Sequence, residues 1–290
     1  MRTIDLFCGA GGSSWGARLA GAELVAAFDA WELAGNVYRD NFPSAKFYHG
    51  RLEDLDLREV VRELGQIDLM LASPECTNHG PAKGSRPRCE ISKNTAFQVT
   101  RFAEAIRPRW ILIENVSAMR RWDRYDELID NLTGLGYNVR PQVLNSADFG
   151  VPQRRRRLFL LCDLARQPDE VEPPSSRNKT AADIVDFDAG YGYSPLRSTR
   201  RAKTTLERAE LAIDELGHKS PFLLVYYGSD QAGGWQSLDV PLRTVTTLDR
   251  FAVVKPESGG HVMRMLQVDE LKAAMGMPDR FKLRHGTRRD

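Results

Sequence analysis

The first 162 residues alternate between short apolar runs and amphipathic stretches, and this alternation constrains the fold more than any other feature. The apolar runs have the length and composition of strands and cover residues 3–7, 24–28, 67–72, 110–113 and 158–162. The intervening stretches are typical of helices and cover residues 13–20, 31–41, 97–106 and 123–132. The pattern predicts an α/β fold with a doubly wound, Rossmann-like, mostly parallel sheet, in which ligands bind at the carboxyl ends of the strands.

Beyond Cys162 the alternation stops. Residues 166–180 form a polar, proline-containing linker, followed by a helical stretch at 204–216, an aromatic strand-like run at 222–227 and a glycine loop, GSDQAGGWQ. We therefore expect a catalytic domain over residues 1–165 and a second, smaller domain over residues 166–290.

The charge balance is nearly neutral, with Lys+Arg 41 against Asp+Glu 39, and it does not by itself indicate a nucleic-acid partner. No apolar run approaches the ~18 residues of a membrane span, and the first residues lack the pattern of a signal peptide. The four cysteines lie far apart without zinc-ligand spacing, so no metal site is expected. These features predict a cytoplasmic protein with reduced thiols.

A glycine turn follows the first predicted strand. Its residues, which we expect to approach a ligand closely, are Phe7, Cys8, Gly9, Ala10, Gly11 and Gly12. Asp29 comes twenty residues after Gly9 at the end of the second strand, where an acidic side chain can accept ribose hydroxyls. The turn alone does not distinguish S-adenosylmethionine from a dinucleotide, and glycines alone could also mark a purely structural turn.

Three further groups lie near strand ends. Cys76 stands two residues after a proline, at the start of a polar loop, and is a candidate nucleophile, although a lone cysteine is often buried and inert. Glu114 ends an apolar strand and is a candidate acid, unless it is an ordinary surface glutamate. Residues 154–157 are four arginines, and strand alternation would place Arg155 and Arg157 on one face. Such a run could also be a solvated face or a nucleic-acid patch.

Five segments in this order resemble the cytosine C5 DNA methyltransferases: DLFCGAGG, SPEC, ENV, NSADFGVPQRRRR and LDVPLRTVTT. The resemblance extends from residue 3 to about residue 281. It implies S-adenosylmethionine as cofactor, with Phe7 and Trp31 on the two sides of the adenine and Asp29 on the ribose. It also implies that the substrate is a cytosine flipped out of double-stranded DNA.

The same resemblance assigns the catalytic roles. Cys76 would add to C6 of cytosine, Glu114 would bind or protonate N3, and Arg157 would hold O2. Arg155 would fix the carboxylate or the thiolate. Methyl transfer of this kind needs no metal ion.

The second domain is expected to choose the DNA sequence. Its basic cluster (Arg197, Arg200, Arg201 and Lys203) suits phosphates, and its glycine loop could read base edges or be a plain hairpin with a core tryptophan. The residues predicted to contact DNA are Arg86, Arg88, Asn115, Gln153, Arg200, Arg201, Gln231 and Gln236.

The chain departs from the family at three places. Glu75 stands directly before Cys76, Arg51 stands where an acidic residue is common, and no Gly-Asn segment follows residues 276–281. These departures leave three hypotheses: an active, monomeric DNA methyltransferase of the restriction-modification type, a variant acting on RNA, or a weak or inactive DNA-binding relative.

Overall fold

A computed structural model describes residues 1–75, 95–175, 179–227, 233–248 and 250–286. The chain forms two compact units, each of which is assembled from separate parts of the sequence. The first contains residues 1–144, 156–172 and 282–285, and the second contains residues 145–155, 173–281 and 286–290. The boundary predicted at residue 165 divides the chain once, whereas the chain passes between these units several times.

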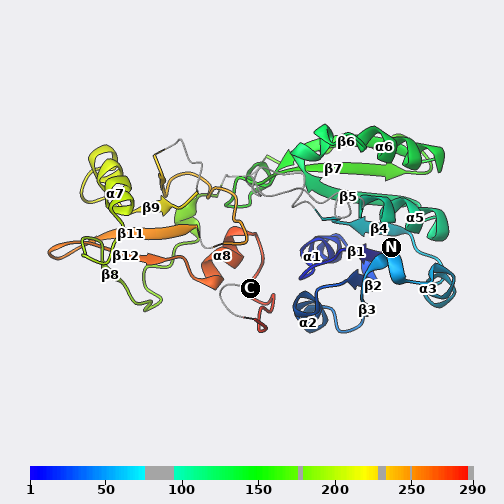
Figure 1. Cartoon of the computed structure of the whole chain (residues 1–290), viewed down its shortest axis with the longest axis horizontal. Helices are drawn as coiled ribbons and strands as arrows, with labels where there is room; N and C mark the ends of the chain where they lie inside the picture. The colour runs from blue at the N-terminus through cyan, green and yellow to red at the C-terminus, as the bar shows by residue number, and fades with distance from the viewer. Residues whose placement is uncertain (76–94, 176–178, 228–232, 249, 287–290) are drawn as a thin grey trace. The chain divides into compact units, whose positions relative to one another are not determined.

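The first unit is built on a seven-stranded sheet in the order β3-β2-β1-β4-β5-β7-β6 (Figure 1). Its strands are β1 (Arg2–Leu6), β2 (Glu23–Asp29), β3 (Lys46–His49), β4 (Leu69–Ala72), β5 (Trp110–Val116), β6 (Asn138–Asn145) and β7 (Arg156–Asp163). The five strands from β3 to β5 pair in parallel, and β7 pairs with β5 in the antiparallel direction. This arrangement confirms the predicted α/β fold with a mostly parallel sheet.

Helices cover this sheet as the alternation of the sequence predicts. They are α1 (Gly12–Leu19), α2 (Glu32–Asn41), α3 (Leu57–Leu64), α5 (Ala96–Ile106) and α6 (Tyr125–Gly134), with short 3-10 turns at η1 (Leu52–Asp54) and η3 (Ser117–Arg121). Figure 1 shows α3, α5 and α6 on one side of the strands and α1 and α2 on the other. The strands are rich in buried Leu, Ile and Phe because a parallel sheet covered on both faces exposes few of its side chains.

The order of the strands determines where this sheet is expected to bind a ligand. The chain proceeds outward from β1 to β2 and β3 on one side, and then returns to β4 and β5 on the other. The carboxyl ends of β1 and β4 therefore lie at the topological switch point, where open α/β sheets bind ligands.

The second unit contains a five-stranded sheet in the order β10-β9-β11-β12-β8. Its elements are η4 (Ser146–Phe149), η5 (Ala181–Asp183), β8 (Ser194–Pro195), α7 (Lys203–Leu216), β9 (Phe222–Val225), β10 (Trp235–Ser237), β11 (Phe251–Glu257), β12 (Gly260–Met265) and α8 (Val268–Ala274). Its strand pairs are antiparallel, and α7 packs against β9 and β10.

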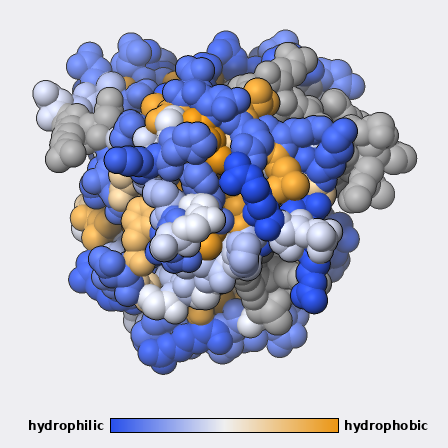
Figure 2. All heavy atoms as spheres, turned by 90° about the vertical axis from the view of Figure 1, so that its left-hand side faces the viewer, coloured by the Kyte–Doolittle hydropathy of each residue, from blue (hydrophilic) through white to orange (hydrophobic). Residues whose placement is uncertain are grey.

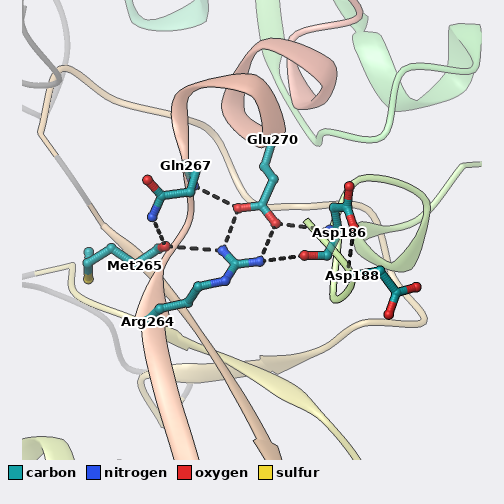
Figure 3. Close-up of polar contacts among 6 residues, drawn as sticks. All are labelled: Asp186, Asp188, Arg264, Met265, Gln267 and Glu270. Carbon is teal, nitrogen blue, oxygen red and sulfur yellow. Dashed lines mark hydrogen bonds and ion pairs between the residues drawn. The ribbon is translucent and has the colours of Figure 1, made fainter. Parts of the chain in front are cut away.

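A buried ion pair joins β12 to α8 in the second unit. Both nitrogens at the end of Arg264 lie 2.7 Å from the Glu270 carboxylate, and each side chain is only 3% exposed (Figure 3). Glu270 also accepts the backbone N–H groups of Gln267 and Asp186, which closes the capping box of α8. The pair thus fixes the corner at which the sheet leads into the last helix.

Candidate active site

The glycine turn after β1 is held by the carboxylate of Asp29. One oxygen accepts the Gly9 backbone N–H at 2.8 Å and the other accepts the Trp31 N–H at 2.8 Å, so Asp29 joins the turn to the start of α2. The backbone of Phe7 (φ 56°) and Gly11 (φ 94°) is left-handed. A non-glycine residue in this conformation is strained, which is common at ligand sites.

The surroundings of the turn fit a nucleoside-containing cofactor. A Cβ built on Gly9 meets no atom within 4 Å, so the backbone there is open to a ligand. The Trp31 side chain is 55% exposed at the end of β2, and an exposed aromatic ring suits stacking on a base. Each Asp29 oxygen accepts one of the two N–H groups above, and a carboxylate retains further lone pairs for ribose hydroxyls.

Three buried side chains next to the glycine turn are linked by hydrogen bonds. Ser14 Oγ lies 2.6 Å from Asp5 and 2.8 Å from the Tyr38 hydroxyl, and Asp5 and Ser14 are fully buried. Burial raises the pKa of Asp5 to about 7. Burial also raises the pKa of the Cys8 thiol, so this cysteine of the turn cannot supply a thiolate at neutral pH. Nothing in the sequence pattern indicates this chain of contacts.

The carboxyl end of β4 lies beside the turn. Ser73 donates its backbone N–H to Leu6 at 3.0 Å, and its hydroxyl lies 3.4 Å from that of Ser13 on α1. Asn115, which is 1% exposed, donates from its side-chain amide to the Pro74 carbonyl at 3.1 Å. The segment that leads to Cys76 is therefore anchored to both neighbouring strands. Cys76, Arg86 and Arg88 themselves lie outside the described residues.

Glu114 and Arg157 form an ion pair across β5 and β7. Arg157 stands opposite Val116, two residues from Glu114, so both side chains lie on the same face of the sheet. The Arg157 Nε lies 2.9 Å from Glu114 Oε1, and the two side chains are 15% and 25% exposed. A guanidinium in this position orients the carboxylate while leaving it accessible. The contact with the carboxylate is thus made by Arg157, the residue that the resemblance assigned to the cytosine O2.

In the second unit, the start of the arginine run pairs with the segment 241–245. Arg154 donates its N–H to Leu242 at 2.7 Å, and Leu242 donates to Pro152 at 2.9 Å. The side chain of Gln153 is 1% exposed, and it accepts the Val245 N–H at 3.0 Å and donates to the Ala274 carbonyl at 3.1 Å. These contacts hold the backbone that carries Arg155.

Three amide side chains predicted to contact DNA are buried. Asn115 and Gln153 are both 1% exposed and Gln236 is 5% exposed, and each makes hydrogen bonds to backbone groups of its own unit. A buried amide needs partners inside the protein, so these residues fix loops from within instead of facing outward. Arg200 is exposed and Arg201 is half-buried, and Gln231 lies outside the described residues.

The sequence matches a known protein family over nearly its whole length. Residues 1–288 match the model of the C-5 cytosine-specific DNA methylases. The chain belongs to this family.

Several curated relatives are named as Type II methyltransferases. The Type II methyltransferase M.HindV of Haemophilus influenzae is 34% identical over 185 residues, which is 61% of this chain and 58% of the relative. The Type II methyltransferase M.HgiDI of Herpetosiphon aurantiacus is 33% identical over 166 residues, 56% of this chain and 52% of the relative. The chain thus matches little more than half the length of these relatives.

Solved structures of low sequence identity share the fold. A putative DNA modification methyltransferase encoded within an Escherichia coli prophage has a TM-score of 0.68 at 17% identity, over 97% of this chain and 90% of that one. The Entamoeba histolytica methyltransferase EhMeth has a TM-score of 0.65 at 17% identity, over 100% of this chain and 90% of that one.

The structure describes the contacts made at two of the places where this sequence differs from the methylase family. Arg51 forms an exposed ion pair with Glu53, at 3.6 Å. The segment after Phe281 joins the first unit, where the Asn41 side chain donates to the Lys282 carbonyl at 2.9 Å and accepts its N–H at 2.8 Å. The end of α2 therefore holds this segment, although it lacks the Gly-Asn motif. Across the described residues, no helix is long and apolar enough to cross a membrane.

Proposed function

We propose that this chain is a DNA (cytosine-5-)-methyltransferase that transfers the methyl group of S-adenosylmethionine to C5 of a cytosine flipped out of duplex DNA. The observation that carries the proposal is the Glu114–Arg157 ion pair, which lies one strand away from the segment leading to Cys76. Membership of the methylase family and the names of the Type II relatives support it.

The proposed chemistry assigns one task to each group. The Cys76 thiolate adds to C6 of cytosine, which raises the electron density at C5. Glu114, oriented by Arg157, binds or protonates N3 and stabilises that density, and Arg157 holds O2. When bound, the cofactor supplies an electrophilic methyl group. Loss of the C5 proton and elimination of Cys76 then release 5-methylcytosine and the free thiol.

The two described cysteines are poor alternatives to Cys76. Burial raises the pKa of the Cys162 thiol to about 12, and it also raises the pKa of Cys8. A thiol that stays protonated at neutral pH is a weak nucleophile. Cys76 comes two residues after the anchored Ser73–Pro74 segment, and this position supports it as the nucleophile.

The residues around the glycine turn are the proposed cofactor site. Asp29 would accept the ribose hydroxyls, and Phe7 and Trp31 would flank the adenine. The partner proposed for the second unit is double-stranded DNA. We further propose that the protein acts as a monomer in the cytoplasm. The names of the Type II relatives support a place in a restriction-modification system.

The experiment that tests this function measures methyl transfer from labelled S-adenosylmethionine to duplex DNA of mixed sequence, followed by sequencing of the modified sites. The Cys76→Ser variant is the control, since a serine hydroxyl is a far poorer nucleophile at neutral pH, and we expect it to bind DNA without turnover. Transfer to RNA alone would contradict the proposed substrate. Normal turnover by Cys76→Ser would remove this residue from the mechanism.

A further inference from the structure

The basic residues of the second unit differ in the partners that they contact. Arg197 pairs with Glu210 at 2.8 Å and Lys203 pairs with Glu207 at 3.5 Å, so each of these positive charges faces a negative one. Both pairs involve α7, and their side chains are well exposed. Half of the basic cluster expected from the sequence is therefore balanced by carboxylates.

Arg208 and Arg250 contact carbonyl groups instead. Arg208 donates from Nη1 to the Val225 carbonyl at 3.1 Å, and Arg250 donates from Nη1 to the next carbonyl, that of Tyr226, at 2.8 Å. Within the described ranges no carboxylate lies at ion-pair distance from either guanidinium. Arg208 and Arg250 thus each place a guanidinium near the end of β9, Arg208 on the side of β10 and Arg250 on the side of β11.

Arg208 also contacts the start of β10. Gly234 accepts the Val225 N–H at 2.7 Å, which brings together the two strands that flank residues 226–233. A Cβ built on Gly234 would lie only 2.4 Å from Arg208 Cδ, so the arginine stem packs directly on this glycine. The guanidinium lies 5.9 Å from the Tyr226 ring. Arg208 is thereby fixed against both strands.

An arginine anchored to a carbonyl is well suited to bind a phosphate. The neutral carbonyl uses one of five N–H donors and leaves the full positive charge, whereas a carboxylate partner would cancel it. The remaining donors can form a bidentate pair with a phosphate, and anchoring reduces the conformational entropy lost on binding. The face of the chain drawn in Figure 2 is mostly hydrophilic, with apolar residues in small separate groups.

We propose that Arg208 and Arg250 bind backbone phosphates of the substrate DNA at the end of β9. This inference rests on the proposed function and names the residues that carry the electrostatic part of its DNA affinity. Neither Arg208 nor Arg250 was indicated by the sequence, since both stand alone among uncharged or acidic neighbours.

The salt dependence of DNA affinity tests this proposal. Binding of a mixed-sequence DNA duplex by the full chain is measured by fluorescence anisotropy over a range of salt concentrations. Each lost phosphate contact should make the slope of log K against log salt less negative by about 0.9. We expect this change in Arg208→Gln and in Arg250→Gln, and about twice the change in the double variant.

Matched variants separate phosphate binding from a structural role. The double variant Arg197→Gln/Glu210→Gln removes a balanced pair and should leave the slope unchanged. Arg250→Lys keeps the charge and should restore most of the slope lost in Arg250→Gln. Unchanged slopes in Arg208→Gln and Arg250→Gln would overturn the inference, even if affinity falls. If the unaltered chain shows no DNA binding, the DNA assignment itself fails and this inference fails with it.

Discussion

At the scale of single residues, Asp29 is the side chain whose role can be tested most directly. It holds the backbone N–H groups of Gly9 and Trp31, and we propose that it also accepts the ribose hydroxyls. Asp29→Ala should therefore weaken S-adenosylmethionine binding by about 1–3 kcal/mol, measured by calorimetric titration. Glu32→Ala removes an exposed acidic residue from the first turn of α2 and should have little effect. Equal affinities of the Asp29→Ala variant and the unaltered chain would place the cofactor elsewhere.

The sequence indicates which residues carry charge at strand ends, but not which way an amide side chain points. Asp29 and Glu114 were expected at the carboxyl ends of strands and Arg157 at the start of one, and the strand order brings these strands into one sheet. Gln153 was predicted to contact DNA, whereas its side chain is only 1% exposed. Its burial depends on Val245 and Ala274, which are distant in the sequence and give no local signal.

At the scale of elements, the start of α1 depends on a glycine that no other residue can replace. Gly11 has φ 94°, and a Cβ there would lie 2.6 Å from Phe42 Cε2. Gly11→Ala should therefore lower the free energy of unfolding by roughly 1–3 kcal/mol, through backbone strain and overpacking. Gly16, four residues into the same helix, has open space around its Cβ position. Gly16→Ala should raise stability by about 0.5–1 kcal/mol, and chemical denaturation of the two variants compares them.

The corner between β12 and α8 allows a second test at this scale. Arg264 and Glu270 are buried together, so removing one partner leaves an uncompensated charge (Figure 3). Arg264→Met should destabilise the second unit by about 3–5 kcal/mol, whereas Arg264→Met/Glu270→Leu should recover most of that loss. Thermal unfolding of both variants checks the difference. A double variant no more stable than Arg264→Met would contradict it.

Edge strands and hairpins were the elements that sequence patterns missed. Strands β3 and β6 lie at the two edges of the large sheet, and their half-exposed, polar residues dilute the apolar pattern. The β11–β12 hairpin could have been predicted from the sequence, because a run with β-branched residues leads into the Gly259–Gly260 turn. The inner strands β1, β4 and β5 were recognised because burial on both faces requires continuous apolar runs.

At the scale of the whole molecule, the sequence predicted two parts in series, and the chain instead passes between two units. Residues 145–155 group with the second unit because Pro152 and Arg154 pair with Leu242, while residues 282–285 group with the first because Lys282 pairs with Asn41. Such pairings join residues far apart in the sequence. Local composition and periodicity therefore cannot reveal them.

The stability of the first unit should carry a pH dependence that originates at Asp5. Its pKa is about 7 in the folded state, because of burial, against an ordinary value of 3.8. Between these two values the folded state binds a proton that the unfolded state releases, so the stabilisation is complete at low pH and is lost as the pH rises through 7. Other carboxylates contribute in the opposite direction, so the effect has to be isolated by comparison with Asp5→Asn, which mimics the neutral acid.

The free energy of unfolding of Asp5→Asn should therefore rise relative to that of the unaltered chain as the pH increases. From the shift above, the difference in free energy of unfolding between the two proteins should change by about 2–3 kcal/mol between pH 5 and pH 8. Urea unfolding at several pH values measures it. If the difference stays constant over this range, Asp5 keeps the same charge throughout, and its hydrogen bond with Ser14 stabilises the carboxylate more than burial penalises it.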